Sequence, residues 1–220
     1  MLQIRLVILD WDGTLMDSEA GIVSAMLLAF RQQQAPLPEY EAVKKIIGLN
    51  LPEAVQELHP SMSSRDVDEV IANYRLNYRV QTPAPVLFPQ VRETLLKLRH
   101  AGYSLAVATG KSRRGLARAI EETDLEDFFA TTRTADESES KPSPAMLYAI
   151  LEELKVEPHG ALMIGDTEFD LAMAKTAGVC AAAVSFGAHS LERLSSYKPA
   201  FILDRFEDLP TQLQRLHAFE

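Results

Sequence analysis

The chain has 220 residues, of which 47% are hydrophobic and 24% are charged, which is the composition of a globular protein and excludes a disordered one. Asp and Glu outnumber Lys and Arg by 31 to 22, and the formal net charge of -9 argues against binding to a nucleic-acid backbone. One cysteine cannot form an internal disulfide. Any site for an anion must therefore gather positive charge locally.

We expect neither a signal peptide nor a membrane span in this sequence. The apolar stretch after Met1 is a few residues long and ends at Asp10, and no later apolar run reaches the length of a membrane span. We expect a cytoplasmic protein without a membrane or nucleic-acid partner. Its oligomeric state stays open, because no sustained heptad pattern marks an interface.

Short apolar runs recur along the chain, each too short for a buried helix and suited to a strand covered on both faces. They lie at 6–9, 105–108, 161–164, 180–184 and 201–203, with a weaker candidate at 128–131. Segments with helical periodicity separate them, for example 91–98 and 146–154. This alternation predicts an α/β fold with a parallel sheet.

The interval from about Leu15 to Pro85 contains no run typical of a strand. Four helical patterns fill it, at about 22–30, 43–47, 52–58 and 67–80. We therefore predict an inserted helical domain over 15–85, between two parts of one core domain at 1–14 and 86–220. The return linker would be the proline-rich segment Thr82–Pro85, because proline stiffens the chain.

The most informative motif is Asp10-Trp-Asp-Gly-Thr14, where the first strand ends and open α/β sheets bind ligands. Asp10 can attack phosphorus or bind a cation, while Asp12 can give a proton to a leaving oxygen. Gly13 permits a tight bend, and Trp11 is expected to pack on the sheet. Taken alone, the motif is equally consistent with a turn rich in Asp and Gly.

Two later segments carry groups suited to an anion. After the second strand, Thr109 and Gly110 can offer a hydroxyl and backbone N–H groups to phosphate oxygens, and Ser112 is expected to cap the next helix. Lys141 precedes a helix predicted to begin near Pro142, where its ammonium group can reach a phosphate or a pair of carboxylates. The alternative for Lys141 is a solvated surface side chain.

The fourth strand ends on Asp166, and Asp170 follows one helical turn later. Both carboxylates can serve a site, or can be charges at a helix N-terminus. The acidic segment 136–140 is expected to be a solvated loop, and Arg113 and Arg114 are expected to be exposed.

Together these segments resemble the four motifs of the haloacid dehalogenase-like (HAD) superfamily in order, spacing and strand-end placement, over nearly the whole chain. The matching residues are Asp10-x-Asp12-Gly-Thr14, Thr109, Lys141 and Gly165-Asp166-x-x-x-Asp170. The pattern is most similar to phosphoglycolate phosphatase-like hydrolases. It implies a Rossmann-like parallel sheet core with an inserted α-helical cap domain, and the cap would be the helical interval.

The resemblance also implies a magnesium phosphatase acting on a small phosphate ester. Mg²⁺ would be held by the carboxylates of Asp10 and Asp166 and by the backbone carbonyl of Asp12. Asp10 would form an aspartyl-phosphate, and Asp12 would act first as acid and then as base. Mg²⁺ prefers a site with few carboxylate ligands, where it keeps several of its bound waters.

The remaining roles follow from the same resemblance. Lys141 and Thr109 would balance charge on the transferring phosphoryl group. Asp170 would orient Lys141 rather than bind the metal. Asn50, in the loop that resembles the substrate-facing loop of such caps, is the candidate substrate contact.

Several alternatives stay open. Asp12 argues against a dehalogenase and against the phosphonoacetaldehyde hydrolase type, which lack this second aspartate. A phosphomutase of the β-phosphoglucomutase type shares both aspartates, although Thr14 favours hydrolysis. Pyrophosphate and nucleotides remain possible substrates. A phospho-accepting receiver module also places Asp, Thr and Lys at strand ends, but needs neither a long insertion nor a second aspartate.

Overall fold

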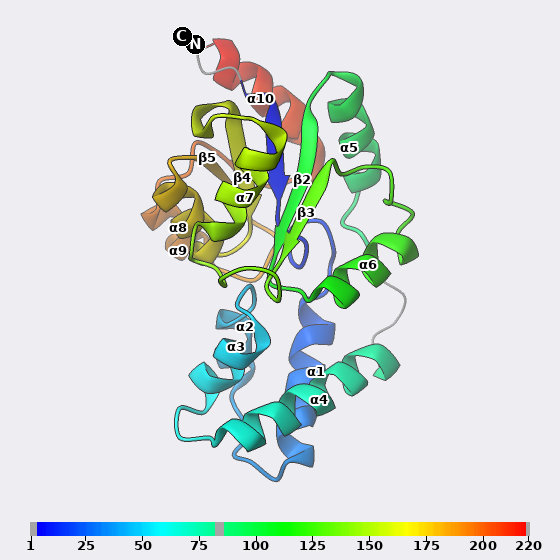
Figure 1. Cartoon of the computed structure of the whole chain (residues 1–220), viewed down its shortest axis with the longest axis vertical. Helices are drawn as coiled ribbons and strands as arrows, with labels where there is room; N and C mark the ends of the chain where they lie inside the picture. Colours follow the sequence, from blue (N-terminus) through cyan, green and yellow to red (C-terminus); the bar gives the residue numbers. More distant parts are fainter. Residues whose placement is uncertain (1–3, 82–85, 219–220) are drawn as a thin grey trace.

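The computed structural model describes residues 4–81 and 86–218. Its centre is one sheet of six parallel strands in the order β3-β2-β1-β4-β5-β6 (Figure 1). The strands are β1 (Leu6–Leu9), β2 (Ser104–Thr109), β3 (Thr131–Thr134), β4 (Ala161–Gly165), β5 (Cys180–Val184) and β6 (Ile202–Leu203). The predicted α/β fold with a parallel sheet is confirmed.

Helices cover both faces of the sheet, which explains why β1 is apolar at every position. Val7 and Leu9 face one core, and Leu6 and Ile8 face the other, and all four are fully buried. The first face is covered by α5 (Val91–His100), α6 (Arg113–Glu122) and α10 (Leu209–Ala218). The second is covered by α7 (Ala145–Leu154) and α8 (Glu168–Ala177), with α9 (Leu191–Ser196) beside α8.

Four helices follow β1 and lie beyond the carboxyl ends of the strands (Figure 1). They are α1 (Glu19–Gln32), α2 (Tyr40–Lys45), α3 (Leu51–Leu58) and α4 (Ser64–Gln81). Their apolar side chains form a second hydrophobic core, centred on α1 and α4, which lie side by side, and Ala188 after β5 packs into it. These four helices, called the cap below, lie at 19–81, within the interval predicted for it. The division into domains at 15 and 85 stays a prediction, and the predicted linker at 82–85 lies outside the described residues.

Two element boundaries differ from the prediction. The third strand begins at Thr131 rather than Phe128, because the Phe128 side chain packs into the core before the chain joins the sheet. The strand has the polar sequence Thr-Thr-Arg-Thr. Polar residues are tolerated here because the strand lies at the sheet edge and is only partly covered. The helix expected near Pro142 begins at Ala145. Within 4–81 and 86–218, no helix is long and apolar enough to cross a membrane.

The hydrophobic core of the cap allows a prediction about the stability of the cap. Phe30 of α1 is fully buried in it, so Phe30→Ala should cost about 3–5 kcal/mol in the free energy of unfolding the cap. Hydrogen exchange should show faster exchange in α1 and α4, with β1 and β2 still protected. Leu76→Ala on the exposed face of α4 is the matched control and should change little. Equal loss of protection in cap and sheet would show that the two unfold as one unit.

Candidate active site

Lys141 lies at the centre of the strand ends and is fully buried. Its Nζ is 2.8 Å from Asp10 Oδ1 and 2.6 Å from Asp170 Oδ1. Asp10 directly follows β1, and its backbone N–H donates to Ile164 O of β4. The lysine is therefore not a solvated surface side chain, because it joins a carboxylate after β1 to a carboxylate on α8.

The start of α8 fixes Asp170. Thr167 and Asp170 form a capping box: the Thr167 hydroxyl and backbone N–H both donate to Asp170 Oδ2, at 2.7 and 3.1 Å. The other oxygen of Asp170 is thereby directed to Lys141. Gly165 makes room for this arrangement, since a Cβ there would lie 2.2 Å from Asp170 Cγ.

Asp166, at the end of β4, completes a cluster of buried carboxylates. Oxygens of Asp10, Asp166 and Asp170 lie within 4.8 Å of one another. Asp166 Oδ1 accepts a hydrogen bond from the Thr14 hydroxyl at 3.0 Å, and Oδ2 accepts one from the Ala188 N–H at 2.7 Å. Thr14 of the first motif therefore orients the carboxylate at the end of β4.

Two glycines allow the backbone to approach Asp166 closely. Gly13 has φ +77, and a Cβ there would lie 2.1 Å from Asp166 Oδ2. A Cβ on Gly187 would lie 2.2 Å from Asp166 Cβ. Trp11, two residues before Gly13, is buried in the core, as expected, with its Nε1–H donating to Met16 Sδ.

The electrostatics of this cluster favour a bound cation. Burial raises the pKa of Asp10 from 3.8 to about 7, although Lys141 acts in the opposite direction. Burial, with the charges of Asp10 and Asp170, raises the pKa of Asp166 well above its usual range. Burial alone would lower the pKa of Lys141, but the two carboxylates it contacts raise it. Three carboxylates face one ammonium group, so a divalent cation with oxygen ligands fits the excess negative charge.

Asp12 points toward the cavity rather than toward Lys141. Both of its oxygens lie 2.9 Å from Lys111 Nζ, and the Ser18 hydroxyl donates to Oδ1 at 2.6 Å. The sequence analysis assigned no role to Lys111. The signal that could have identified Lys111 as a site residue is its position at a strand end, directly after Thr109 and Gly110.

The segment after β2 contacts both the site and the cap. Thr109 is buried and lines the cavity, and its Oγ1 accepts from the Lys111 N–H at 3.2 Å. Ser112 caps α6 as expected, accepting from Gly115 N at 3.2 Å. The backbone of Gly110 lies close to the cap. A Cβ at this position would be only 2.6 Å from Gly48 O.

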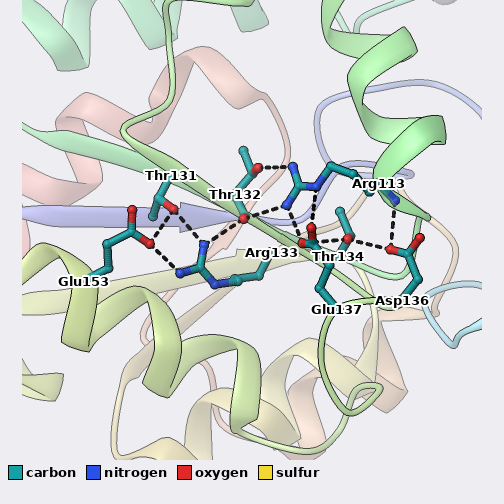
Figure 2. Close-up of polar contacts among 8 residues, drawn as sticks. All are labelled: Arg113, Thr131, Thr132, Arg133, Thr134, Asp136, Glu137 and Glu153. Carbon is teal, nitrogen blue, oxygen red and sulfur yellow. Dashed lines mark hydrogen bonds and ion pairs between the residues drawn. The ribbon is translucent and has the colours of Figure 1, made fainter.

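The acidic loop expected to be solvated also contacts Arg113 (Figure 2). The backbone N–H of Arg113 donates to Asp136 Oδ1 at 2.8 Å, and its Nε donates to Glu137 Oε1 at 2.8 Å. The same guanidinium binds Thr132 on β3. Asp136, Glu137 and Glu139 are exposed, as expected of a solvated loop, and the first two also have Arg113 at the start of α6 as partner. Arg114 is exposed, as expected.

A cavity of about 670 Å³ lies between the core and the cap, and both Asp10 and Asp12 line it. The cap loop is seated on the core, with Asn50 N–H donating to Ser140 Oγ at 3.0 Å. The Asn50 side chain caps α3, accepting from Glu53 N at 2.8 Å and donating to Glu53 Oε1 at 3.0 Å. Its contact with substrate stays a prediction.

Comparison with known proteins identifies the family. A model of haloacid dehalogenase-like hydrolases matches residues 7–184. The chain belongs to this family of enzymes. It is 36% identical over 209 residues to a probable phosphatase, IndB, of Dickeya dadantii (strain 3937), covering 93% of this chain and 91% of that protein. It is 32% identical over 213 residues to a pyrophosphatase, PpaX, of Bacillus cereus (strain B4264), covering 94% and 95%.

The fold of this HAD-like chain also matches solved structures. A predicted phosphoglycolate phosphatase from Haemophilus somnus 129pt superposes with a TM-score of 0.86 over 95% of this chain and 97% of that one, at 23% identity. The Rossmann-like sheet with a helical cap is therefore shared. The relatives named as phosphatases agree with a phosphatase family.

The buried contacts of Lys141 predict a large effect of removing its charge. Lys141→Met leaves Asp10 and Asp170 facing each other without a cation, which should cost about 3–5 kcal/mol in the free energy of unfolding. Because carboxyls of raised pKa keep protons in the folded state that the unfolded chain releases, the loss should be larger at pH 8 than at pH 5. Urea unfolding at both pH values measures it. Lys97→Met, on the exposed face of α5, is the control. A loss no larger than that of the control would contradict the structural role.

Proposed function

We propose that the protein is a Mg²⁺-dependent phosphatase that hydrolyses a small phosphate monoester through an aspartyl-phosphate on Asp10. The observation that carries the proposal is the position of Asp10. It lines the cavity, lies 2.8 Å from the ammonium group of Lys141, and belongs to the cluster of buried carboxylates with Asp166. A nucleophile, a fixed cation and a site for a metal thus meet at one point.

The carboxylates that suit the metal are those of Asp10 and Asp166, with the backbone carbonyl of Asp12 as a further ligand. Bound Mg²⁺ would offset the repulsion between these carboxylates and an anionic phosphate. Lys141 and the Thr109 hydroxyl would contact the phosphoryl oxygens, where negative charge is spread in the transition state. The backbone N–H of Gly110 is a further donor at this position.

In the first step, an oxygen of Asp10 attacks phosphorus in line, and the bond from phosphorus to the leaving oxygen breaks. Asp12 gives its proton to that oxygen. In the second step, Asp12 takes a proton from water, the resulting hydroxide attacks the phosphorus, and Asp10 is released with inorganic phosphate. Lys141 stays in place through both steps, because Asp170 holds it.

The cap supports this chemistry by covering the site. Its loop packs against Gly110 through Gly48 and against Ser140 through Asn50. A closed cap keeps bulk water from the reacting phosphorus and presents its own side chains to the leaving group.

The relatives suggest two kinds of substrate. A phosphoglycolate-like monoester agrees with the fold match and with the phosphatase relative. Inorganic pyrophosphate is the second candidate, favoured by the pyrophosphatase relative at 32% identity. Both carry negative charge beyond the transferred phosphoryl group.

We predict that Asp10→Asn lowers the single-turnover rate by at least about a thousandfold, because an amide cannot act as the nucleophile. Circular dichroism should show an unchanged fold. Asp68→Asn on the exposed face of α4 removes the same charge away from the site and should keep full activity. Turnover by Asp10→Asn at the rate of this control would reject the covalent mechanism.

We also predict that activity disappears in excess chelator and returns with Mg²⁺. Because Mg²⁺ would bind only the folded state, it should raise the melting temperature of the wild type, and Asp166→Asn should remove this increase. The thermal shift is independent of turnover. Full activity in chelator, or the same Mg²⁺ shift in both proteins, would count against the metal site. Ca²⁺ should inhibit, because its looser shell disturbs in-line attack.

A further inference from the structure

Lys111 lies where Asp12, which is the predicted acid, the cavity and the cap meet. Its Nζ lies 2.9 Å from both oxygens of Asp12 and 5.2 Å from the centre of the Tyr78 ring on α4. The side chain of Lys111 is 11% exposed and that of Asp12 is 14% exposed. The pair therefore lies at the wall of the cavity, reachable by a ligand but largely out of solvent.

The cavity wall around Lys111 is rich in cations, in contrast to the chain as a whole. Four arginines of the cap and of α6 line the same cavity: Arg75, Arg79, Arg114 and Arg118. Arg118 pairs with Glu122 at 2.6 Å. Within 4–81 and 86–218, no carboxylate forms an ion pair with the other three. Lys111 and these four arginines face four carboxylates that also line the cavity, Asp10, Asp12, Glu122 and Asp136. The cavity lining is therefore more positive than the chain as a whole, which favours an anionic ligand.

The pair between Lys111 and Asp12 conflicts with the proposed role of Asp12. To serve the leaving group, Asp12 must present an oxygen to it, but Lys111 covers both oxygens. Lys111 must therefore move away when substrate binds, and a mostly buried ammonium group needs another anion as partner. The transferred phosphoryl group is already served by Lys141. The remaining partner is an anion on the leaving group.

Tyr78 provides a second group at the same place. Its hydroxyl is buried and has no hydrogen-bond partner among the described residues. A buried hydroxyl without a partner is costly unless a ligand satisfies it. Lys111 comes from the core and Tyr78 from the cap, so the two groups meet only when the cap is closed.

We propose that Lys111 and the Tyr78 hydroxyl together bind a second anionic group, a carboxylate or a phosphate, on the leaving group of the substrate. Binding of this group draws Lys111 away from Asp12 and leaves an oxygen of Asp12 facing the leaving oxygen. Substrates with an uncharged leaving group leave Lys111 on Asp12 and react more slowly. The inference rests on the proposed phosphatase function and names the class of substrate for that site.

The test compares ligands that differ in the second anion. The kinetic pair is 2-phosphoglycolate and ethyl phosphate. Lys111→Met should lower kcat/KM for phosphoglycolate by at least about thirtyfold, because the substrate carboxylate loses a largely buried cation. Activity on ethyl phosphate should not fall and should rise a few-fold, because Lys111 no longer covers the oxygens of Asp12 when the leaving group is uncharged. Lys111→Arg should restore part of the preference, and Lys97→Met should behave as wild type.

A binding experiment makes the test independent of turnover. Calorimetry with Mg²⁺ present compares 3-phosphonopropionate, which carries the carboxylate, with propylphosphonate, which lacks it. The wild type should prefer the first, Lys111→Met should lose the preference, and Tyr78→Phe should lose about three- to tenfold of it, as expected for one hydrogen bond.

Three results would overturn the inference: equal loss by Lys111→Met on both substrates, no loss on either, or no preference of the wild type for the phosphonate with a carboxylate. Failure of the phosphatase function itself has a different signature. In that case Asp10→Asn would keep wild-type turnover or neither ester would be hydrolysed, while the binding preference would still report on Lys111.

Discussion

The buried ion pairs of Lys141 with Asp10 and Asp170 are the constraint on which the site depends. An ammonium group with no exposure is stable only if carboxylates surround it, and these come from the end of β1 and the first turn of α8. The capping box of α8 and the missing side chain of Gly165 both serve this geometry. The site is thus built where the central strand β1 ends and α8 begins.

Much of the fold followed from the sequence because central strands of a doubly covered sheet are apolar throughout. β1, β4 and β5 were predicted to within one residue. The edge strand β3 was placed too early, because it is polar and only partly covered, so no apolar run marks it. The other edge strand, β6, was located because it lies in an apolar run. Hydrophobic patterning therefore fails for an edge strand only where that strand is polar.

Some parts of the site could likewise be predicted from the sequence and others could not. The strand-end aspartates and Lys141 belong to a pattern readable in order along the chain, whereas the contact between Asp12 and Lys111 joins residues 99 positions apart. The sequence shows Lys111 close to a strand end, but it does not show that Asp12 is its partner. Asn50 was different: Asn followed three residues later by Glu53 is a helix start signal, and the structure uses it as a cap.

The two lysines of the site differ in how firmly they are held, and this difference suits two tasks. Lys141 has two carboxylate partners and no exposure, so it has no alternative position. Lys111 has one partner, lies at the cavity wall and touches a cap ring, so a ligand anion can compete for it. A cation fixed on both sides can stabilise the same phosphoryl group in every substrate. A cation that can exchange partners can distinguish one leaving group from another, and this is the role that we propose for Lys111 where the core meets the cap.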